Sequence, residues 1–295
     1  MREEKLDARP DVSVVVPCHN GASTLRAQLS ALADQQTRAS FEVLLCDNGS
    51  TDGSAAVVGE YDERFRVVEA GEVRGINHAR NRGISASAAP LLLFCDADDR
   101  VHPGWLEAYW RAFGDGAALM GGSLRRVAGA STAEEEDTPD VVWQHGLNDY
   151  LGFLPWATGA NCGLARTVVD ACGPFDETYR GGGDETEFFW RAQLAGFGLR
   201  FVGDAAIDYV RRPSSAGVYR QNRDFGRSHV RLFVQFRQHG MRRRFGAQMT
   251  GALGRTVVRL ARSRGSARHR RALVAQLGIL AGHARQSVSS RSLYV

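Results

Sequence analysis

The sequence has no long apolar run and no paired cysteine motif. No stretch reaches about 18 uninterrupted apolar residues, the length that a membrane-spanning helix needs, and the charged first residues lack the apolar region of a signal peptide. No Cys-x-x-Cys pair occurs, and cysteines in or just beyond predicted strands are typical of small buried residues in a reducing compartment. We therefore expect a cytoplasmic protein. Its cysteines are Cys18, Cys46, Cys95, Cys162 and Cys172.

Three common metal and nucleotide motifs are also missing. The histidines show no His-Glu-x-x-His spacing, which disfavours a zinc site. No Gly-x-x-x-x-Gly-Lys-Ser/Thr loop is present, which argues against a P-loop nucleotidase. The lack of Gly-x-Gly-x-x-Gly after the first predicted strand weakens a dinucleotide-binding interpretation.

Acidic residues are absent from the last part of the chain. Residues 241–295 contain 12 Arg and no Asp or Glu, although the net charge of the whole chain is only +4. Two basic amphipathic patterns, 248–263 and 268–286, predict helices there. These helices either hold the protein against anionic lipid or pack on the domain with their arginines facing water. Aromatic residues are almost absent from the segment, which disfavours nucleic-acid binding.

From Val12 onward the chain alternates strand and helix patterns, which predicts an α/β fold with a mostly parallel sheet flanked by helices. The predicted strands are 12–17, 41–46, 65–69, 90–95, 117–127 and 159–165. The predicted helices are a segment with Leu25, Leu29 and Leu32 on one face, then 54–61, 75–87, 104–113, 184–194 and 218–238. Residues 128–140 are small and acidic, which predicts a loop. We expect one domain over 1–240 and a basic helical C-terminal extension over 241–295.

An apolar run ends in three carboxylates at residues 91–99, LLLFCDADD. The run is typical of a buried strand, but Asp96, Asp98 and Asp99 cannot be packed together without a positive charge between them. A bound divalent cation is one source of this positive charge, and hard oxygen ligands favour Mg²⁺ or Mn²⁺. The alternative is a solvated turn after an edge strand, since Asp is common in turns.

Other polar clusters also adjoin the predicted strands. They are 18–20, 47–52 and 74–82, and in an open α/β sheet ligands bind beyond the carboxyl ends of the strands. We therefore expect one crevice that gathers these clusters with the acidic residues of the fourth strand. Arg74, Arg80 and Asn81 are candidates to meet the phosphates or base of a nucleotide. The alternative for them is a solvated helix face with local ion pairs.

A second acidic site follows three glycines at 181–183. The glycines allow close approach of the backbone, and Asp184 and Glu185 open a predicted helix. One interpretation is a general base, which needs a carboxylate with a raised pKa and a route to substrate. The other is a favourable pair of first-turn residues, stabilised by the helix dipole.

Taken together, these segments resemble the family 2 glycosyltransferases, which have the Rossmann-like GT-A fold. The resemblance covers about residues 11–203 and is specific because the motifs occur in the order and spacing of the family. The matching segments are Val14–Asn20, Asp47–Gly53, Ala79–Gly83, Phe94–Asp99, Gly159–Cys162, and Asp184-Glu185 before Trp190-Arg191.

The resemblance implies an inverting transfer of a sugar from a nucleoside diphosphate sugar, with UDP favoured. Asp96 and Asp98 look like the Asp-x-Asp pair that holds Mn²⁺ or Mg²⁺, with Asp98 as the more direct ligand. Glu185 corresponds to the usual base position, and Asp184 is a reserve candidate because the family's Glu-Asp order is swapped here. The donor-binding set is Pro17, His19, Asn20, Asp47, Asn48, Arg74, Arg80, Asn81, Asp96, Ala97 and Asp98.

The resemblance leaves the acceptor open: a saccharide, a lipid-linked molecule or a small molecule, used in the synthesis of cell-surface polysaccharide, glycolipid or another glycoconjugate. The Gln-x-x-Arg-Trp signature of processive synthases is absent, so we expect addition of one or a few sugars. Two alternatives remain at this point. A sugar-phosphate nucleotidyltransferase is disfavoured because CHNGAST stands where such enzymes carry a Gly-rich, Lys/Arg-containing loop. A non-catalytic sugar-nucleotide-binding protein is the other.

Overall fold

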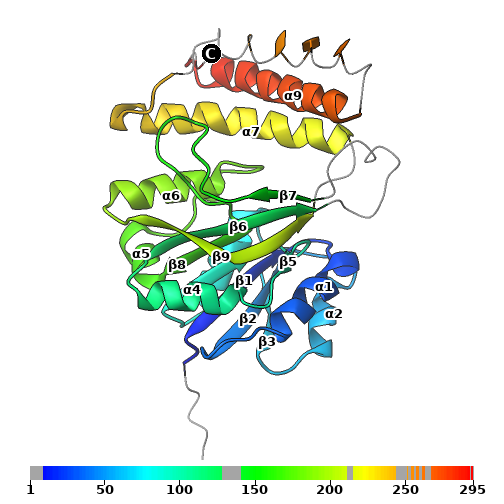
Figure 1. Ribbon diagram of the computed structural model, residues 1–295, viewed down its shortest axis with the longest axis vertical. Coiled ribbons are helices and arrows are strands. Elements are labelled where there is room, and N and C mark those ends of the chain that lie inside the picture. Colours follow the sequence, from blue (N-terminus) through cyan, green and yellow to red (C-terminus); the bar gives the residue numbers. More distant parts are fainter. Residues whose placement is uncertain are drawn as a thin grey trace, which may run out of the picture.

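A computed structural model describes residues 9–127, 141–210, 215–243 and 267–292, together with Tyr294 and scattered residues between 251 and 262. It is a sheet covered by helices on both faces, with two long helices stacked above one end (Figure 1). No helix in the described ranges combines the length and the apolar character needed to cross a membrane.

The first half of the sheet is parallel. Its strands are β1 (Val12–Cys18), β2 (Phe41–Asp47), β3 (Phe65–Glu69) and β4 (Leu91–Cys95), in the order β3-β2-β1-β4. Every residue of β1 and β4 is buried, because helices cover both faces of the sheet, and this explains their unbroken apolar sequences. The carboxyl ends of these strands therefore meet at one edge, as the sequence predicts.

The second half of the sheet is mixed. β8 (Asn161–Ala165) runs antiparallel to β4 and to β6 (Leu119–Val127), whereas β9 (Leu199–Val210) runs parallel to β6. Two short strands, β5 (Arg100–Val101) and β7 (Val141–Gln144), pair antiparallel with β9 and β6. The predicted α/β class is confirmed, and the parallel pairs lie within β1–β4 and between β6 and β9.

Helices on the two faces bury separate cores. On one face lie α1 (Ala22–Ala33), the short α2 (Ser54–Val57), the 3₁₀ turn η1 (Val58–Glu60) and α4 (Trp105–Gly114). The predicted stripe on α1 is confirmed, since Leu25, Leu29 and Leu32 are fully buried. The other face is covered by α3 (Ile76–Ala86), α5 (Arg166–Cys172) and α6 (Asp184–Leu194).

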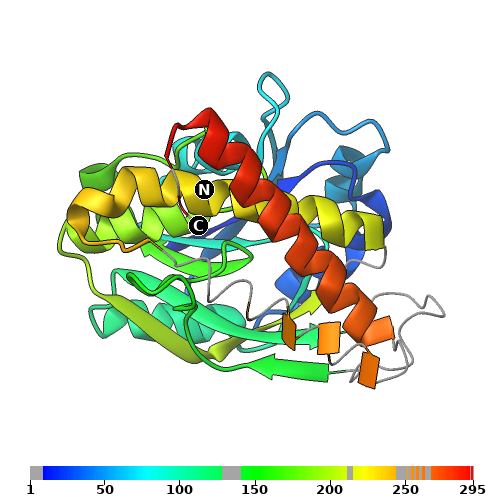
Figure 2. The ribbon, with the colours of Figure 1, turned by 90° about the horizontal axis from the view of Figure 1, so that it is seen from above.

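Two long helices come after the last strand of the sheet in the chain. α7 (Ser215–Phe236) packs Val230, Phe233 and Phe236 into the core beside α6, and the 3₁₀ turn η2 (Arg237–His239) ends it. α9 (Ala267–Ser289) crosses α7 on its outer side (Figures 1 and 2). The crossing is close because Gly226 and Gly282 have no side chain: a Cβ at either would collide with a backbone carbonyl of the facing helix.

The sequence prediction differs from the structure in several elements. It missed β5, β7, β9 and α5. β5 and β7 have only 2 and 4 residues, too few for a clear pattern, and β9 is only partly buried along its length. The predicted helix 268–286 is confirmed as α9. The predicted loop 128–140 lies outside the described residues, and the predicted helix 248–263 lies largely outside them.

Candidate active site

A cavity of about 410 Å³ opens at the carboxyl ends of β1 and β4. It is bounded by the loop after β1, the start of α1, one side of α3 and the residues that follow β4. The sequence prediction of a common crevice agrees with this arrangement. The predicted donor-binding residues that line it are Pro17, His19, Asn20, Asn48, Asp96, Ala97 and Asp98.

Three carboxylates gather at the end of β4. Oxygen atoms of Asp96, Asp98 and Asp99 all lie within 4.8 Å of one another. Asp98 is exposed, whereas Asp99 is only 3% exposed and accepts one hydrogen bond, from the backbone N–H of Val210 at 3.1 Å. Burial, followed by the charges of Asp96 and Asp98, raises the pKa of the Asp99 carboxyl to about 9.

This cluster fits a hard divalent cation. The Oδ2 atom of Asp99 is buried and has no hydrogen-bond partner among the described residues, so the burial of this oxygen is left uncompensated. Carboxylate oxygens are the ligands that Mg²⁺ and Mn²⁺ prefer. The donor set therefore suits either ion.

The loops after β2 and β3 lie beside this cavity. Of the predicted donor-binding residues there, Asn48 lines the cavity, whereas Asp47 and Arg74 do not. Asn48 donates to the carbonyls of Ala70 and Val73 and accepts from the N–H of Gly75, so it holds the loop before α3. Arg74, on that loop, places Nη1 3.2 Å from Nδ1 of His19. Asp47, at the end of β2, is buried and accepts a hydrogen bond from the N–H of Ser50 at 3.0 Å.

Arg80 and Asn81 are neighbours on α3, but their side chains lie in different surroundings. Asn81 donates to the carbonyl of Phe175 at 2.9 Å and to Glu177 at 2.8 Å, and it lines none of the cavities along the cleft. Of this predicted pair, Arg80 therefore faces the cleft, and Asn81 fixes α3 to the loop after α5.

The Arg80 guanidinium joins the two acidic sites. Nη1 donates to Oδ2 of Asp184 at 2.6 Å, and Nη2 lies 3.9 Å from Oδ1 of Asp96. Burial alone would lower the pKa of Arg80, but the carboxylates of Asp184 and Asp96 raise it, so the guanidinium stays charged. Gly159 provides the space for it, because a Cβ there would collide with the guanidinium.

A second cavity, of about 590 Å³, continues the cleft beyond Asp96. It shares Ile76 and Asp96 with the first cavity, so the two adjoin. Arg80, Asp184 and Glu185 line it from α3 and α6, and residues of α7 form its far wall. The two acidic sites that the sequence singled out therefore face one continuous space.

The glycine loop brings α6 close to α7. Gly181, Gly182 and Gly183 all have positive φ, and a Cβ on Gly182 would collide with the ring of Phe225. The loop leads directly into Asp184, which is 4% exposed, and Glu185, which is partly exposed. Burial, and then the charge of Asp184, raises the pKa of Glu185 well above its usual value, as a general base requires.

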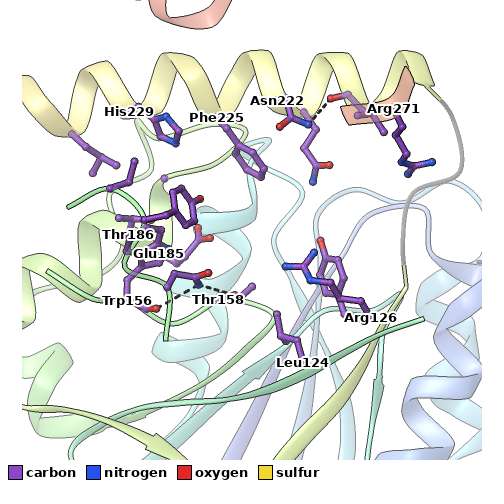
Figure 3. A pocket seen from close by; sticks show the side chains of 18 residues that line it. Leu124, Arg126, Trp156, Thr158, Glu185, Thr186, Asn222, Phe225, His229 and Arg271 are labelled. Carbon is purple, nitrogen blue, oxygen red and sulfur yellow. Dashed lines mark hydrogen bonds between the residues drawn. The ribbon is translucent and has the colours of Figure 1, made fainter. Parts of the chain in front are cut away.

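A third cavity, of about 340 Å³, lies on the other side of Glu185 (Figure 3). It shares Thr158, Glu185 and Tyr209 with the second cavity. Glu185 and the glycine loop were predicted from the sequence, but the other lining residues were not, because α7 and α9 carry no recognisable motif and reach the site only through tertiary packing. Among the lining residues are Arg126, Tyr150, Trp156, Asn222, Phe225, His229 and Arg271.

Comparison with known proteins identifies the family. A sequence model described as Glycosyl transferase family 2 matches residues 13–169, which is more than half of the chain. The chain belongs to glycosyl transferase family 2. This glycosyltransferase is 28% identical to glycosyltransferase AglE of Haloferax volcanii over 232 residues, which cover 76% of this chain and 75% of AglE. It is 33% identical over 156 residues to succinoglycan biosynthesis protein ExoU of Rhizobium meliloti, covering 50% of this chain but only 43% of ExoU.

Solved structures confirm the GT-A fold of this family 2 enzyme. Mannosyltransferase PcManGT from Pyrobaculum calidifontis, in complex with GDP-Man and Mn²⁺, matches with a TM-score of 0.62 and 16% identity, over 95% of this chain and 88% of that one. Staphylococcus aureus TarS 1-349 in complex with UDP matches with a TM-score of 0.55 and 18% identity, over 95% and 91% of the two chains. Family membership favours sugar transfer over the nucleotidyl transfer that the sequence alone left open.

Proposed function

We propose that this glycosyltransferase transfers a sugar, with inversion, from a nucleoside diphosphate sugar to an acceptor hydroxyl, and that it requires a divalent cation. One observation carries the proposal: Asp96 of the carboxylate cluster and Glu185 line the same cavity. The diphosphate would lie at Asp96 and Asp98, and the acceptor hydroxyl at Glu185. Glu185 would take the proton of the acceptor hydroxyl, whose oxygen would bond to the anomeric carbon on the face opposite the diphosphate. The bond from that carbon to the diphosphate oxygen would break, which gives inversion.

Mn²⁺ or Mg²⁺, held by Asp98 and Asp96, would neutralise the charge that develops on the departing diphosphate. His19, Asn20 and Arg74 would surround the nucleotide in the first cavity, and Asp47 would contact its base or ribose.

Glu185 is the proposed base, and Asp184 positions Arg80. The Asp184 carboxylate is engaged by the buried guanidinium, whereas Glu185 is partly exposed and lines both the second and the third cavities. A hydroxyl in the third cavity can therefore reach Glu185 from the side away from Asp96. Proton acceptance by such a carboxylate contributes about 10²–10⁴-fold to the rate.

UDP is the proposed nucleotide, and TarS in complex with UDP supports it as a ligand of this fold. A thermal-shift panel of UDP, GDP and their sugars, with and without Mn²⁺, tests nucleotide and metal together. The largest shift is expected for UDP with Mn²⁺, and Asp98→Ala should remove it. A shift that is equal with EDTA, or unchanged in Asp98→Ala, would contradict the metal role.

We further propose that the enzyme acts in the cytoplasm on cell-surface polysaccharide or glycolipid precursors and adds one or a few sugars. Two facts support this: ExoU is a succinoglycan biosynthesis protein, and all five cysteines are free. We retain the domain boundary at 240 as part of the proposal.

The basic extension 241–295 would contact anionic lipid peripherally. α9 lies on the outer side of α7 (Figure 1). Arg270 and Arg285 on α9 are exposed. Sedimentation with anionic vesicles at low salt should weaken in Arg270→Glu/Arg285→Glu. Equal sedimentation of variant and wild type would leave α9 with a packing role alone.

A further inference from the structure

The third cavity is placed to receive the acceptor. It meets the second cavity at Glu185, so a molecule bound in it presents a hydroxyl to the proposed base without crossing the donor space. This inference rests on the proposed function, because it takes Glu185 as the base. The chemistry of the cavity wall then indicates what kind of acceptor fits.

One wall of the cavity is aromatic. The rings of Tyr150 and Trp156 meet edge to face, with centroids 4.8 Å apart, and His229 of α7 lies 6.3 Å from the Tyr150 ring. Trp156 is buried and Tyr150 is exposed, so the pair forms a fixed surface with an accessible outer face. Asn148 donates to Thr158 Oγ1 at 3.3 Å beside it. Aromatic faces with a few placed polar groups are typical of small-molecule sites.

The opposite end of the cavity is cationic. In Figure 3, Glu185 lies on one side of the space, and Arg126 and Arg271 lie on the other. Arg126 projects from β6, donates to Gln144 Oε1 at 3.0 Å and lies over the Tyr209 ring at 5.3 Å. It forms no ion pair with any residue that the structure describes. Arg271 comes from the first turns of α9.

The charge of the lining is complementary to an anion. Among the described residues that line this cavity, Glu185 is the one acid, and it stands at the end where the hydroxyl must react. Two guanidinium groups at the other end match a phosphate, which carries a charge of about −1.5 to −2 at neutral pH. A guanidinium also offers paired donors that fit phosphate oxygens.

We infer that the acceptor of this enzyme carries a phosphate, bound by Arg126 and Arg271, while its hydroxyl faces Glu185. α9 then has a role in substrate recognition, because it supplies one of the two cations. The phosphate belongs either to a free sugar phosphate or to a lipid-linked saccharide.

Calorimetry in EDTA tests this site apart from the donor site, since the carboxylates of Asp96 and Asp98 repel phosphate when no cation is present. The probes are glucose 6-phosphate, geranyl diphosphate, glucuronate and glucose. One or both phosphate probes should bind the wild type. Arg126→Gln and Arg271→Gln should each weaken that binding about tenfold or more, the loss expected for a charge-assisted hydrogen bond.

Arg111→Gln is the matched control, because Arg111 is exposed on α4 and lines none of the three cavities of the cleft. It should bind the probes like the wild type, and circular dichroism should show all three variants folded. Tighter binding of geranyl diphosphate identifies a lipid-linked source, and tighter binding of glucose 6-phosphate identifies a free sugar phosphate.

Equal binding by wild type and both cleft variants would overturn the inference, as would binding of glucose or glucuronate as tight as that of the phosphate probes. The inference would also be overturned if neither of the two phosphate probes bound the wild type. The outcome is separable from that of the proposed function: these titrations need neither cation nor turnover, whereas the proposed function fails on the Asp98 dependence of donor binding.

Discussion

Arg80 donates to Asp184 at 2.6 Å, and both side chains are almost completely buried. The pair stands between the carboxylate cluster and Glu185, so one guanidinium fixes the relative position of the two acidic sites. Taking both charges out of water is costly. Removing one partner of such a pair strongly destabilises the folded protein, because the other charge is then buried without a partner. Because the Arg80–Asp184 pair lies in the cleft, we infer that it serves to hold the acidic residues of the cleft in position.

Replacing Arg80 should therefore destabilise the whole enzyme. Arg80→Met leaves the Asp184 carboxylate buried without its cation, at a cost of about 3–5 kcal/mol in the free energy of unfolding, measured with urea. The control is Arg82→Met, since Arg82 is 46% exposed in its pair with Glu72 and should lose less than about 1 kcal/mol. Similar losses in both variants would show that the buried pair has no special role.

The rate of transfer should depend on the protonation of Glu185. Its raised pKa means that the neutral form, which cannot accept a proton, persists well above the usual pH for a glutamic acid. The ratio kcat/KM should rise with pH in that range. Asp184→Asn should move the rise to lower pH, because the charge of Asp184 raises the pKa of Glu185. A rise at the same pH in wild type and Asp184→Asn would contradict this coupling.

The same shift has a consequence for stability. Because the folded-state pKa of Glu185 is above the unfolded value, the stability that its neutral form contributes is complete below the unfolded pKa and is lost as pH rises through the folded pKa. Glu185→Gln stays neutral, so its Tm should exceed that of the wild type by a margin that grows with pH. A margin that stays constant or shrinks as pH rises would mean that Glu185 has no raised pKa.

The contact between α7 and α9 should depend on Gly226. Gly226→Ala puts a methyl group against the backbone of Ile279, and overpacking of this kind costs about 1–3 kcal/mol despite the better helix propensity of alanine. Gly114→Ala in α4 is the control, since its Cβ meets nothing within 4 Å. Urea denaturation should show a loss for Gly226→Ala and little change or a gain for the control. Equal stability of the two variants would mean that the helices do not meet closely.

The sequence predicted the parallel strands, the carboxylates after β4 and the convergence at one sheet edge, because these follow from local patterns. The sequence alone did not show that Arg80 faces the cleft and Asn81 does not, since both lie on one short helix. Only the packing shows that Asn81 faces the loop at 175–177. The sequence also placed Gly159 and Asn161 in a matching segment of the family, but it did not predict their structural roles. Gly159 provides the space for Arg80, and Asn161 accepts from Trp105 and Tyr109 in the core.

The third cavity was beyond sequence reasoning for a similar reason. Its walls come from β6, the segment 148–158, α6, β9, α7 and α9, which are far apart in the chain. Arg126 and Arg271 each look like one arginine among many in an arginine-rich sequence. Their shared position follows only from the folded structure, in which α9 crosses α7 (Figure 2) and both arginines line one cavity.

The central claim is that the carboxylate cluster binds the donor while Glu185 drives transfer in the same cleft. The most direct test compares Asp98→Ala and Glu185→Gln by calorimetry with a nucleoside diphosphate sugar and Mn²⁺, and by turnover of that donor. Asp98→Ala should lose metal-dependent binding; Glu185→Gln should keep the donor affinity and lose about 10²-fold or more in kcat. Wild-type turnover in Glu185→Gln, or unchanged metal-dependent binding in Asp98→Ala, would contradict the account.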